Sequence, residues 1–400
     1  MDAIFQRYAD FSLELELAGK NGEGRYEFTE IAQPALFALQ VGITSMLRKR
    51  GLRPTAAAGH SVGEIAAAWA AGALSLPDAV QVIYYRSMLQ GKTKGNGQMT
   101  AVAACEADVS KLIKDLGLGS DVNISGVNSP RGITLAGDSE SLSSFETVLA
   151  GKQIRYKRLD LDYAFHSPAM DGIEENIKSA LKRIQPVRGN IPYYSTVTGR
   201  QLEGTELNAD YWWHNIRKPV LFENAIKEII EKGDNLFIEV GPHTVLSGYI
   251  NECLRDADIE GRVLPTIRRN EGHVQHILKT VNQAIIAGAE IERERFFPMN
   301  GSFVNIPNYP WQRERYWFEN TSESLGLLER WTVHPLLGYP LKQQALTWEN
   351  RLDSRRLPLL ADHVVGDATV FPGAGYAELA LAAARAWRPE DAVIDIEELE

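Results

Sequence analysis

The sequence predicts an α/β protein with a mostly parallel sheet, and three observations support this fold class. Residues 52–71 combine a short apolar strand, a glycine turn and an alanine-rich helix. Residues 97–160 alternate between short apolar strands and helical segments. The 400 residues are 44% hydrophobic and 24% charged, which is typical of a globular chain of two or three domains.

The elements of the first part follow from apolar spacing and capping residues. Residues 1–20 are expected to form one amphipathic helix, and residues 29–49 a second helix that Gly51 ends. A strand at 52–58 leads into the turn, and the next helix runs to about Ala71, where Gly72 closes it. Ser75 and Pro77 begin another helix that continues to about Gln90.

From Gly97 the predicted order is strand, helix, strand, strand, helix, strand, over 99–104, 106–116, 122–127, 132–136, 139–150 and 154–159. This order is that of the split ferredoxin-like unit, so a small domain is inserted into the larger one. The chain then returns through a loop at 160–170, with a helix to about Ile184, strands at 191–196 and 235–240, and a helix near 222–231. Residues 211–215 are expected to precede that helix, and His214 and His243 to be structural.

Charge and cysteine content exclude several classes of protein. The net charge of −10 disfavours a nucleic-acid partner, which would require a basic face. Cys105 and Cys253 form no metal or redox spacing, so a reducing compartment is expected. The N-terminus lacks a signal-like apolar core and the most apolar run, residues 65–76, is too short to span a bilayer. We therefore expect a cytoplasmic protein without a membrane partner.

Ser61 lies in the pattern Gly59-x-Ser61-x-Gly63, at a turn between strand and helix. Such a turn projects a serine hydroxyl outward, and the backbone N–H of Val62 at the start of the helix is placed to stabilise an oxyanion. The pattern is short, so a tight turn that merely contains a serine is an equally good interpretation of it alone.

Two further residues are candidates for the same site. Arg86, on the helix after the turn, has a planar guanidinium suited to a carboxylate, although an ion pair with Glu64 or a solvated charge is the commoner role. His166 lies in the return loop before Ser167 and Pro168, where a histidine is more often a capping or surface residue than a base.

Five motifs together resemble the acyltransferase domain of modular type I polyketide synthases. They are Gly59-His60-Ser61-Val62-Gly63-Glu64, Tyr85-Arg86-Ser87, Gly126-Val127-Asn128-Ser129-Pro130, Tyr163-Ala164-Phe165-His166-Ser167 and Glu239-Val240-Gly241-Pro242-His243. The resemblance implies an α/β-hydrolase-like parallel-sheet domain with the ferredoxin-like insert beside its cleft. Residues 309–317 (including Trp311, Tyr316 and Trp317) look like the linker after such domains, and residues 334–338 like the start of a dehydratase domain with a partial hot-dog segment.

Carried over, the resemblance implies that Ser61 is the nucleophile, His166 the general base and Arg86 the partner of a malonyl-type carboxylate. A backbone carbonyl near Gly241 is expected to orient His166. Acyl-coenzyme A would esterify Ser61, and the phosphopantetheine thiol of an acyl carrier protein would collect the acyl group, with no bound cofactor or metal. The ketosynthase and dehydratase domains of the same synthase are the other expected partners.

Extender choice is expected to depend on Val62, Tyr163 and Phe165. In the family, the motif that ends in the base is His-Ala-Phe-His in enzymes specific for malonyl and Tyr-Ala-Ser-His in enzymes specific for methylmalonyl. Tyr163-Ala164-Phe165-His166 combines the two motifs. Because Phe165 fills the space of a methyl branch and Val62 resembles malonyl forms, malonyl is favoured over methylmalonyl.

The sequence departs from the family pattern in two places. The family's N-terminal strand and Gly-Gln-Gly-Ser-Gln-type loop, whose glutamine assists the oxyanion hole, have no counterpart, so that segment is either missing or acylation is impaired. Residues 360–373 resemble the dehydratase histidine motif, but Gly366 comes one place early. His363 would be the base of a complete dehydratase, which is not expected within these residues.

The expected organisation is 1–96 and 161–268 for the large subdomain, 97–160 for the small one, 269–325 for the linker and 326–400 for the incomplete dehydratase. Two alternatives to the transferase remain. A serine hydrolase would pass the acyl group to water, although Arg86 and the lack of an acid partner for His166 disfavour it. A non-catalytic docking fragment of a synthase is the other.

Overall fold

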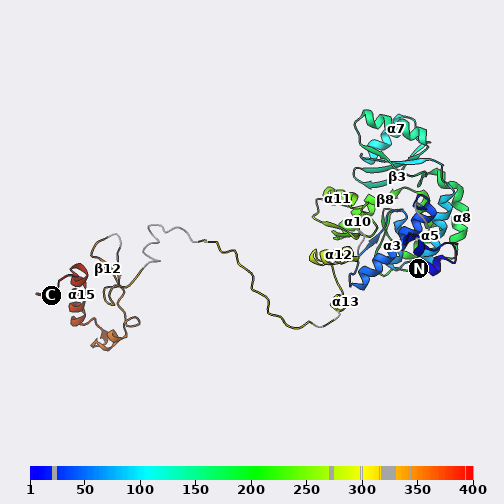
Figure 1. Ribbon diagram of the computed structural model, residues 1–400. Coiled ribbons are helices and arrows are strands. Elements are labelled where there is room, and N and C mark those ends of the chain that lie inside the picture. Colours follow the sequence, from blue (N-terminus) through cyan, green and yellow to red (C-terminus); the bar gives the residue numbers. More distant parts are fainter. Residues whose placement is uncertain are drawn as a thin grey trace. The chain divides into compact units, whose positions relative to one another are not determined.

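The computed structural model describes residues 1–19, 25–269, 274–297, 299, 301–314, 316, 330–341, 344–391 and 393–399. The chain divides into two compact units, Met1–Ser302 and Phe303–Glu400. The first unit contains the layered helices and sheets, and the second holds a few short elements around one helix (Figure 1).

The first residues form two short helices, so the prediction of one helix over 1–20 is wrong. α1 spans Asp2–Phe5 and α2 spans Leu13–Leu17. The Asp2 carboxylate accepts a hydrogen bond from the Leu13 N–H at 2.7 Å, and Ser12 caps α2, which folds the chain back on itself. Phe5 and Leu13 are nevertheless buried, as their apolar character requires.

The helix before the glycine turn and the two helices after it were predicted correctly. α3 spans Thr29–Lys49, α4 Gly63–Ala71 and α5 Leu76–Gly91. Gly72 ends α4 with φ = 80°, and the Ser75 hydroxyl caps α5 by accepting the Asp78 N–H at 3.2 Å. Apolar residues of α4 and α5 share one buried cluster with Phe37 of α3.

The large subdomain contains two pairs of parallel strands, as the predicted fold class requires. β1 (Ala57–Ala58) is parallel to β6 (Tyr193–Ser195), and β7 (Arg200–Leu202) joins β6 antiparallel. β9 (Leu236–Glu239) is parallel to β10 (Arg262–Pro265). The strand predicted at 52–58 is shorter than expected because 53–55 are exposed, while Leu52 forms an isolated bridge to Ile291.

The small subdomain has the predicted split topology (Figure 1). Its elements are β2 (Gln98–Val102), α6 (Glu106–Asp115), β3 (Val122–Ser129), β4 (Gly132–Gly137), α7 (Ser139–Gly151) and β5 (Tyr156–Arg158). The strand order is β5-β2-β4-β3, and β8 (Val220–Leu221) then adds a fifth strand parallel to β3. This fifth strand comes from the later part of the chain and ties the insert to the large subdomain.

The return segment contains more helix than predicted. η2 (Pro168–Ile173) and α8 (Glu174–Leu181) follow His166, and α9 (Ala209–Arg217) includes residues 211–215, which had been expected to precede a helix. Asn208 caps α9 through the Tyr211 N–H at 3.0 Å. The remaining elements of this unit are η1 (Arg25–Glu27), η3 (Gly204–Glu206), α10 (Phe222–Glu231), α11 (Ser247–Asp256), α12 (Val274–Ile286) and α13 (Arg293–Phe296).

The first unit extends beyond residue 268, where the linker was expected to begin. Ile277, Val281 and Ala284 of α12 pack with Ile43 and Leu47 of α3 in one buried cluster. Residues 301–314 carry neither helix nor strand. Trp317 and the predicted boundary at 325/326 lie outside the described residues.

The described residues of the second unit include two antiparallel strand pairs and one long helix. β11 (Tyr339–Pro340) pairs with β12 (Trp348–Glu349), and β13 (Val364–Val365) with β14 (Ala368–Thr369). η4 (Pro358–Asp362) precedes β13, and α15 (Gly373–Trp387) follows β14. Among the described helices of both units, none has the length and apolar character needed to cross a bilayer.

Candidate active site

Ser61 occupies the sharp turn between β1 and α4, as predicted. Its φ of 51° is in the left-handed region, which is strained for a residue with a side chain. A Cβ on Gly59 would lie 2.2 Å from the carbonyl carbon of Gly63, so only glycine fits there. A Cβ on Gly63 would meet only Gln40 Nε2, at 3.7 Å, so close packing requires glycine at position 59 and not at position 63.

The Ser61 hydroxyl and the His166 imidazole meet, as predicted. Ser61 Oγ lies 2.7 Å from His166 Nε2, and His166 Nδ1 lies 2.9 Å from the backbone oxygen of Lys218. Because a carbonyl oxygen can only accept, Nδ1 carries the proton, and Nε2 is free to accept the hydrogen of Ser61 Oγ. This is the tautomer that a general base requires.

The carbonyl that orients His166 was predicted wrongly. It belongs to Lys218, directly after the last residue of α9, rather than to a residue near Gly241. The carbonyls at the end of a helix, including that of the first residue after it, have no N–H donor within the helix. The Lys218 oxygen is therefore available to a side chain. His166 itself has φ = 58°, so the loop holds the backbone of this residue in a strained conformation.

Arg86 reaches the same hydroxyl from α5. Its side chain is 2% exposed, and Nη2 donates to Ser61 Oγ at 2.9 Å. Nε donates to Asn215 Oδ1 at 3.0 Å, while Nη1 donates to Gln33 Oε1 and, at 2.9 Å, to Gln90 Oε1. These neutral partners exclude the solvated charge, and none of the described ion pairs joins Arg86 to Glu64.

Asn215 and the role of Glu64 were not predicted from the sequence. Asn215 Nδ2 donates to the Ser61 backbone oxygen at 3.1 Å and to Glu64 Oε1 at 3.2 Å, while its Oδ1 holds Arg86. Glu64 is fully buried and also accepts hydrogen bonds from the hydroxyls of Tyr193, Tyr211 and Thr196. The position of Asn215 two residues after the Trp212-Trp213 pair gave no signal of this contact.

The electrostatics of the site follow from burial. Burial first, then the positive charge of Arg86 and the electrostatic influence of His60, lower the pKa of His166 to about 3. Burial likewise lowers the pKa of Arg86 to about 9, with the Glu64 carboxylate opposing that shift. At neutral pH the imidazole is therefore uncharged and the guanidinium positive.

A residue of the small subdomain contacts the turn between β1 and α4. His60 Nε2 lies 2.7 Å from Asn128 Oδ1 of β3, and Asn128 Nδ2 donates to Thr134 Oγ1 at 2.9 Å. Burial lowers the pKa of His60, so this imidazole is also neutral. The contact joins the residue beside Ser61 to the sheet of the insert.

Comparison with known proteins identifies the family of this site. The acyl transferase domain model matches residues 1–291. The loading acyltransferase of the avermectin modular polyketide synthase is 33% identical, with a TM-score of 0.68 over 71% of this chain and 89% of that one. The chain belongs to the acyltransferase family of polyketide synthases.

Other comparisons agree with this assignment. The acyltransferase domain from module 8 of the salinomycin polyketide synthase is 32% identical, with a TM-score of 0.69 over 74% of this chain and 69% of that one. Polyketide synthase GfsB of Streptomyces halstedii is 34% identical over 94% of this chain. That alignment covers only 7% of GfsB, so the chain spans a small part of the length of such synthases.

Of the three residues expected to select the acyl group, Tyr163 and Phe165 lie just before His166 in sequence and pack against each other. The rings of Tyr163 and Phe165 stack with centroids 4.8 Å apart and planes 12° apart. Val62 is the residue that precedes the first turn of α4, and its N–H donates to no group among the described residues. That N–H is thus available at the positive end of a helix.

The second unit carries the dehydratase resemblance. The polyketide synthase dehydratase domain model matches residues 334–400, which confirms the predicted dehydratase segment. His363 is exposed, and its Nδ1 lies 2.8 Å from the Val370 oxygen across the β13–β14 hairpin. Within the described parts of both units, no cluster of three His, Cys, Asp or Glu side chains could hold a metal ion.

Proposed function

We propose that this acyltransferase loads a malonyl-type extender unit from acyl-coenzyme A onto an acyl carrier protein through an acyl-Ser61 intermediate. One observation carries the proposal: His166 Nε2 at 2.7 Å and Arg86 Nη2 at 2.9 Å share the Ser61 hydroxyl. A base and a cation beside one nucleophile suit an acyl group that ends in a carboxylate.

In the first half-reaction Ser61 Oγ attacks the thioester carbonyl and its proton passes to His166 Nε2. The negative charge that develops on the carbonyl oxygen is stabilised by the Val62 N–H. The bond to sulfur then breaks, and the imidazolium returns its proton to the coenzyme A thiolate. Because the pKa of His166 is lowered to about 3, its protonated form is a strong acid and gives up the proton readily.

In the second half-reaction the phosphopantetheine thiol of the carrier protein gives its proton to His166 and attacks the acyl ester. Ser61 Oγ leaves and recovers the proton, which restores the enzyme. The reaction as proposed uses the substrate, the carrier's phosphopantetheine arm and the side chains of this chain, with no bound cofactor. The ketosynthase and dehydratase domains of the same synthase are the proposed neighbours.

The guanidinium of Arg86 is proposed to pair with the free carboxylate of the extender. Nη2 has two hydrogens and donates one of them, to Ser61 Oγ, among the described residues. Burial lowers the pKa of Arg86 only to about 9, so the charge persists at neutral pH. A charge-assisted pair in a buried site is stronger than one in water.

Intact-mass measurement after incubation with malonyl-coenzyme A tests the proposal. We expect a malonyl adduct on the wild-type chain and none on Ser61→Ala. Addition of a carrier protein should then move the adduct to the carrier. Release of free malonate without a carrier, at the rate of transfer to the carrier, would instead identify a hydrolase. The absence of any adduct would favour a non-catalytic docking fragment.

We propose malonyl rather than methylmalonyl as the extender, because Phe165 stacks on Tyr163 close to the base. Phe165→Ser opens the space of a ring and should shift the malonyl-to-methylmalonyl ratio of kcat/KM toward methylmalonyl. One methyl group is worth about 1–3 kcal/mol in a fitted pocket, which is about 10- to 200-fold. A competition assay with both acyl-coenzyme A substrates measures the ratio, and an unchanged ratio would remove Phe165 from the selectivity argument.

A further inference from the structure

Glu64 is a buried carboxylate that the proposed reaction does not use. It lies in the first turn of α4, directly after Gly63, and its side chain is fully buried. A buried charge is costly unless hydrogen bonds or an opposite charge compensate for the lost water. The partners of this carboxylate therefore determine what it does in the molecule.

Among the described residues, the Glu64 carboxylate accepts four hydrogen bonds. Oε1 accepts from the Thr196 hydroxyl and, at 3.2 Å, from Asn215 Nδ2. Oε2 accepts from the hydroxyls of Tyr193 and Tyr211. Two bonds to each oxygen match the lone pairs of an ionised carboxylate, whereas a protonated carboxyl group would have to donate one of them. The geometry therefore fits the anion.

The two tyrosine hydroxyls can also direct their hydrogens away from position 64. Tyr193 Oη lies 3.0 Å from Tyr211 Oη, which in turn lies 2.8 Å from Ser195 Oγ. With an amide at position 64, its NH₂ group would donate to both tyrosines, and their own hydrogens would point along this chain of hydroxyls. Glu64→Gln thus leaves each of these groups a partner and removes only the charge.

One side-chain amide joins the Glu64 carboxylate to Arg86. Asn215 Nδ2 donates to Glu64 Oε1 at 3.2 Å, and Asn215 Oδ1 accepts from Arg86 Nε at 3.0 Å. The amide therefore directs its oxygen to the cation and its N–H to the anion. Both charges favour this orientation, and each stabilises the amide that holds the other.

The other partners of the Arg86 guanidinium are uncharged. They are the side chains of Gln33, Gln90 and Ser61. Burial lowers the pKa of Arg86 to about 9, and the negative charge of Glu64 opposes this shift. Within the described part of the chain, Glu64 is thus the carboxylate that balances the charge of Arg86 before a substrate binds.

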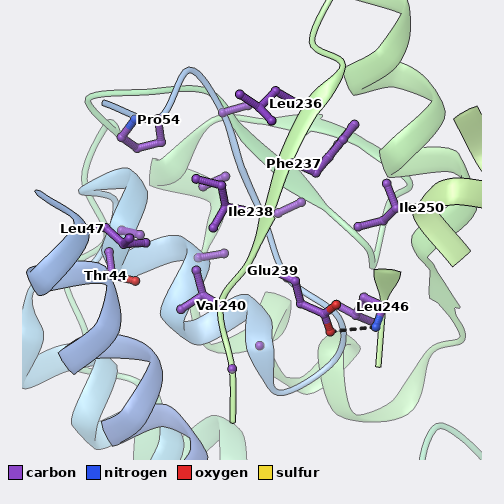
Figure 2. Close-up of a pocket in the computed structure, with 18 of the residues that line it drawn as sticks. Thr44, Leu47, Pro54, Leu236, Phe237, Ile238, Glu239, Val240, Leu246 and Ile250 are labelled. Atoms are coloured by element: carbon purple, nitrogen blue, oxygen red, sulfur yellow. Dashed lines mark hydrogen bonds between the residues drawn. The ribbon is translucent and has the colours of Figure 1, made fainter. Parts of the chain in front are cut away.

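Glu239 shows how a buried carboxylate is held in this fold without a cation. Its oxygens accept backbone N–H groups around the start of α11, at 2.6, 2.8 and 3.0 Å, from Val245, Leu246 and Ser247. Figure 2 shows the bond between Glu239 and Leu246. The N-terminus of a helix is a favourable place for a negative charge. The described partners of Glu64 are instead three hydroxyls and one amide, so its charge depends on Arg86.

A substrate carboxylate that pairs with Arg86 brings a second negative charge to the same cation. Two like charges roughly 8 Å apart, at an effective dielectric constant of about 20, weaken binding about 30-fold. Glu64 therefore lowers the affinity of Arg86 for a carboxylate. It has no such effect on an acyl group that carries no charge.

We propose that Glu64 is the buried counter-charge of Arg86 and sets how tightly the site holds the free carboxylate of a malonyl-type substrate. This role rests on the proposed function, in which Arg86 pairs with that carboxylate. Removal of the charge makes the site hold the carboxylate more tightly, whereas the loss of a purely structural contact would loosen it. Tighter binding of substrate and transition state alike lowers KM without raising kcat, so the native charge costs no turnover.

Isothermal titration of the full chain tests the proposal, in a Ser61→Ala background where no acyl transfer occurs. Glu64→Gln should lower the Kd of malonyl-coenzyme A at least fivefold and change that of acetyl-coenzyme A by less than about twofold. Glu146→Gln is the matched control, because this carboxylate of α7 pairs with Arg158, and it should change neither value. An unchanged or raised Kd of malonyl-coenzyme A in Glu64→Gln would overturn the proposal.

The unfolding midpoint tests the pairing of the two charges without any substrate. Glu64→Gln should lower the midpoint, because it leaves the buried cation uncompensated, and should lower it much less in an Arg86→Met background. Equal losses in both backgrounds would overturn the counter-charge. If Glu64→Gln does not fold, the double variant should, and a double variant that also fails to fold would overturn it too.

The two measurements also separate this proposal from the proposed function. A parent chain that binds malonyl- and acetyl-coenzyme A equally well, with the midpoints as expected, would overturn the pairing of Arg86 with the acyl carboxylate and the effect of Glu64 on the substrate. A preference for malonyl-coenzyme A that Glu64→Gln does not strengthen would overturn the role of Glu64 alone.

Discussion

Asn215 connects three groups of the site that come from three different helices or turns. It accepts from Arg86 Nε, and it donates to the Ser61 backbone oxygen and to Glu64 Oε1. It touches neither the hydroxyl nor the imidazole, so it acts on the reaction by positioning Arg86 and the backbone of Ser61. Asn215 is therefore a positioning residue for the carboxylate partner.

Asn215→Ala should lower kcat/KM for malonyl-coenzyme A by about 5- to 150-fold, because a buried charged donor left unpaired costs about 1–3 kcal/mol. Acetyl-coenzyme A has no carboxylate for Arg86, so its slower reaction should fall less. Initial rates with both substrates measure the difference, with Asn251→Ala, at an exposed position of α11, as the control. Equal losses for the two substrates would reduce Asn215 to a structural residue.

The buried imidazole of His166 gives stability a defined pH dependence. Its pKa is lowered to about 3 in the folded chain, against 6.5 in the unfolded state. Between these values the unfolded state binds more protons, so stability rises with pH up to about 6.5 and is lost as pH falls toward 3. His166→Gln removes this proton uptake.

On lowering the pH from 7 to 5.5, wild type should therefore lose about 1 kcal/mol more stability than His166→Gln, since one pKa unit corresponds to about 1.4 kcal/mol. Urea unfolding at both pH values gives the comparison. Identical losses in the two proteins would show that the imidazole is not neutral and buried in solution. The rate of Ser61 acylation should also stay flat from pH 5 to 8, because the base is unprotonated throughout.

At the scale of elements, the turn between β1 and α4 depends on a single glycine. A Cβ on Gly59 would lie 2.2 Å from the Gly63 backbone, and only movement of the turn can relieve that overlap. Gly59→Ala should thus abolish Ser61 acylation and lower the unfolding midpoint. Gly63→Ala, whose Cβ meets nothing closer than 3.7 Å, is the matched control and should keep the fold. Thermal unfolding and adduct formation test both variants, and an active Gly59→Ala would contradict the steric argument.

The elements that local chemistry determines were predicted well. α5 begins after Ser75 because the Ser75 hydroxyl accepts a free N–H of the first turn, and Pro77 suits that turn because it has no N–H to leave unpaired. α4 ends at Gly72 because glycine adopts φ = 80°. The split topology of the insert followed from alternating strand and helix patterns. In contrast, α1 and α2 are separate because Asp2 bonds to the distant Leu13 N–H, a contact that helical periodicity does not encode.

The same distinction holds for the site. Ser61, His166 and Arg86 were identified from motifs, and their side chains meet. The Lys218 carbonyl and the Asn215 side chain were not identified from the sequence, because neither a backbone oxygen at a helix end nor a buried side-chain amide belongs to a recognisable motif. Their roles depend on how α9 packs against the turn, which is a property of the tertiary structure.

At the scale of the whole molecule, the proposed catalytic residues all belong to the unit Met1–Ser302. The segment that follows it has exposed aromatic side chains: Phe303 is 92% exposed, and Tyr309 and Trp311 are 68% and 74% exposed. Residues 301–314 also lack helix and strand. Backbone of this kind fits a protease cleft without prior unfolding.

Limited chymotrypsin digestion of the full chain should therefore cut first between Phe303 and Tyr316, and release a fragment that ends near Ser302. Since Ser61, His166 and Arg86 are retained with their hydrogen-bond partners, this fragment should still take up malonyl from malonyl-coenzyme A at a rate within about twofold of the intact chain. Mass spectrometry of the labelled digest measures both the cut and the adduct. Initial cleavage inside the first unit, or a fragment that accepts no malonyl, would show that residues 303–400 contribute to the acyltransferase fold.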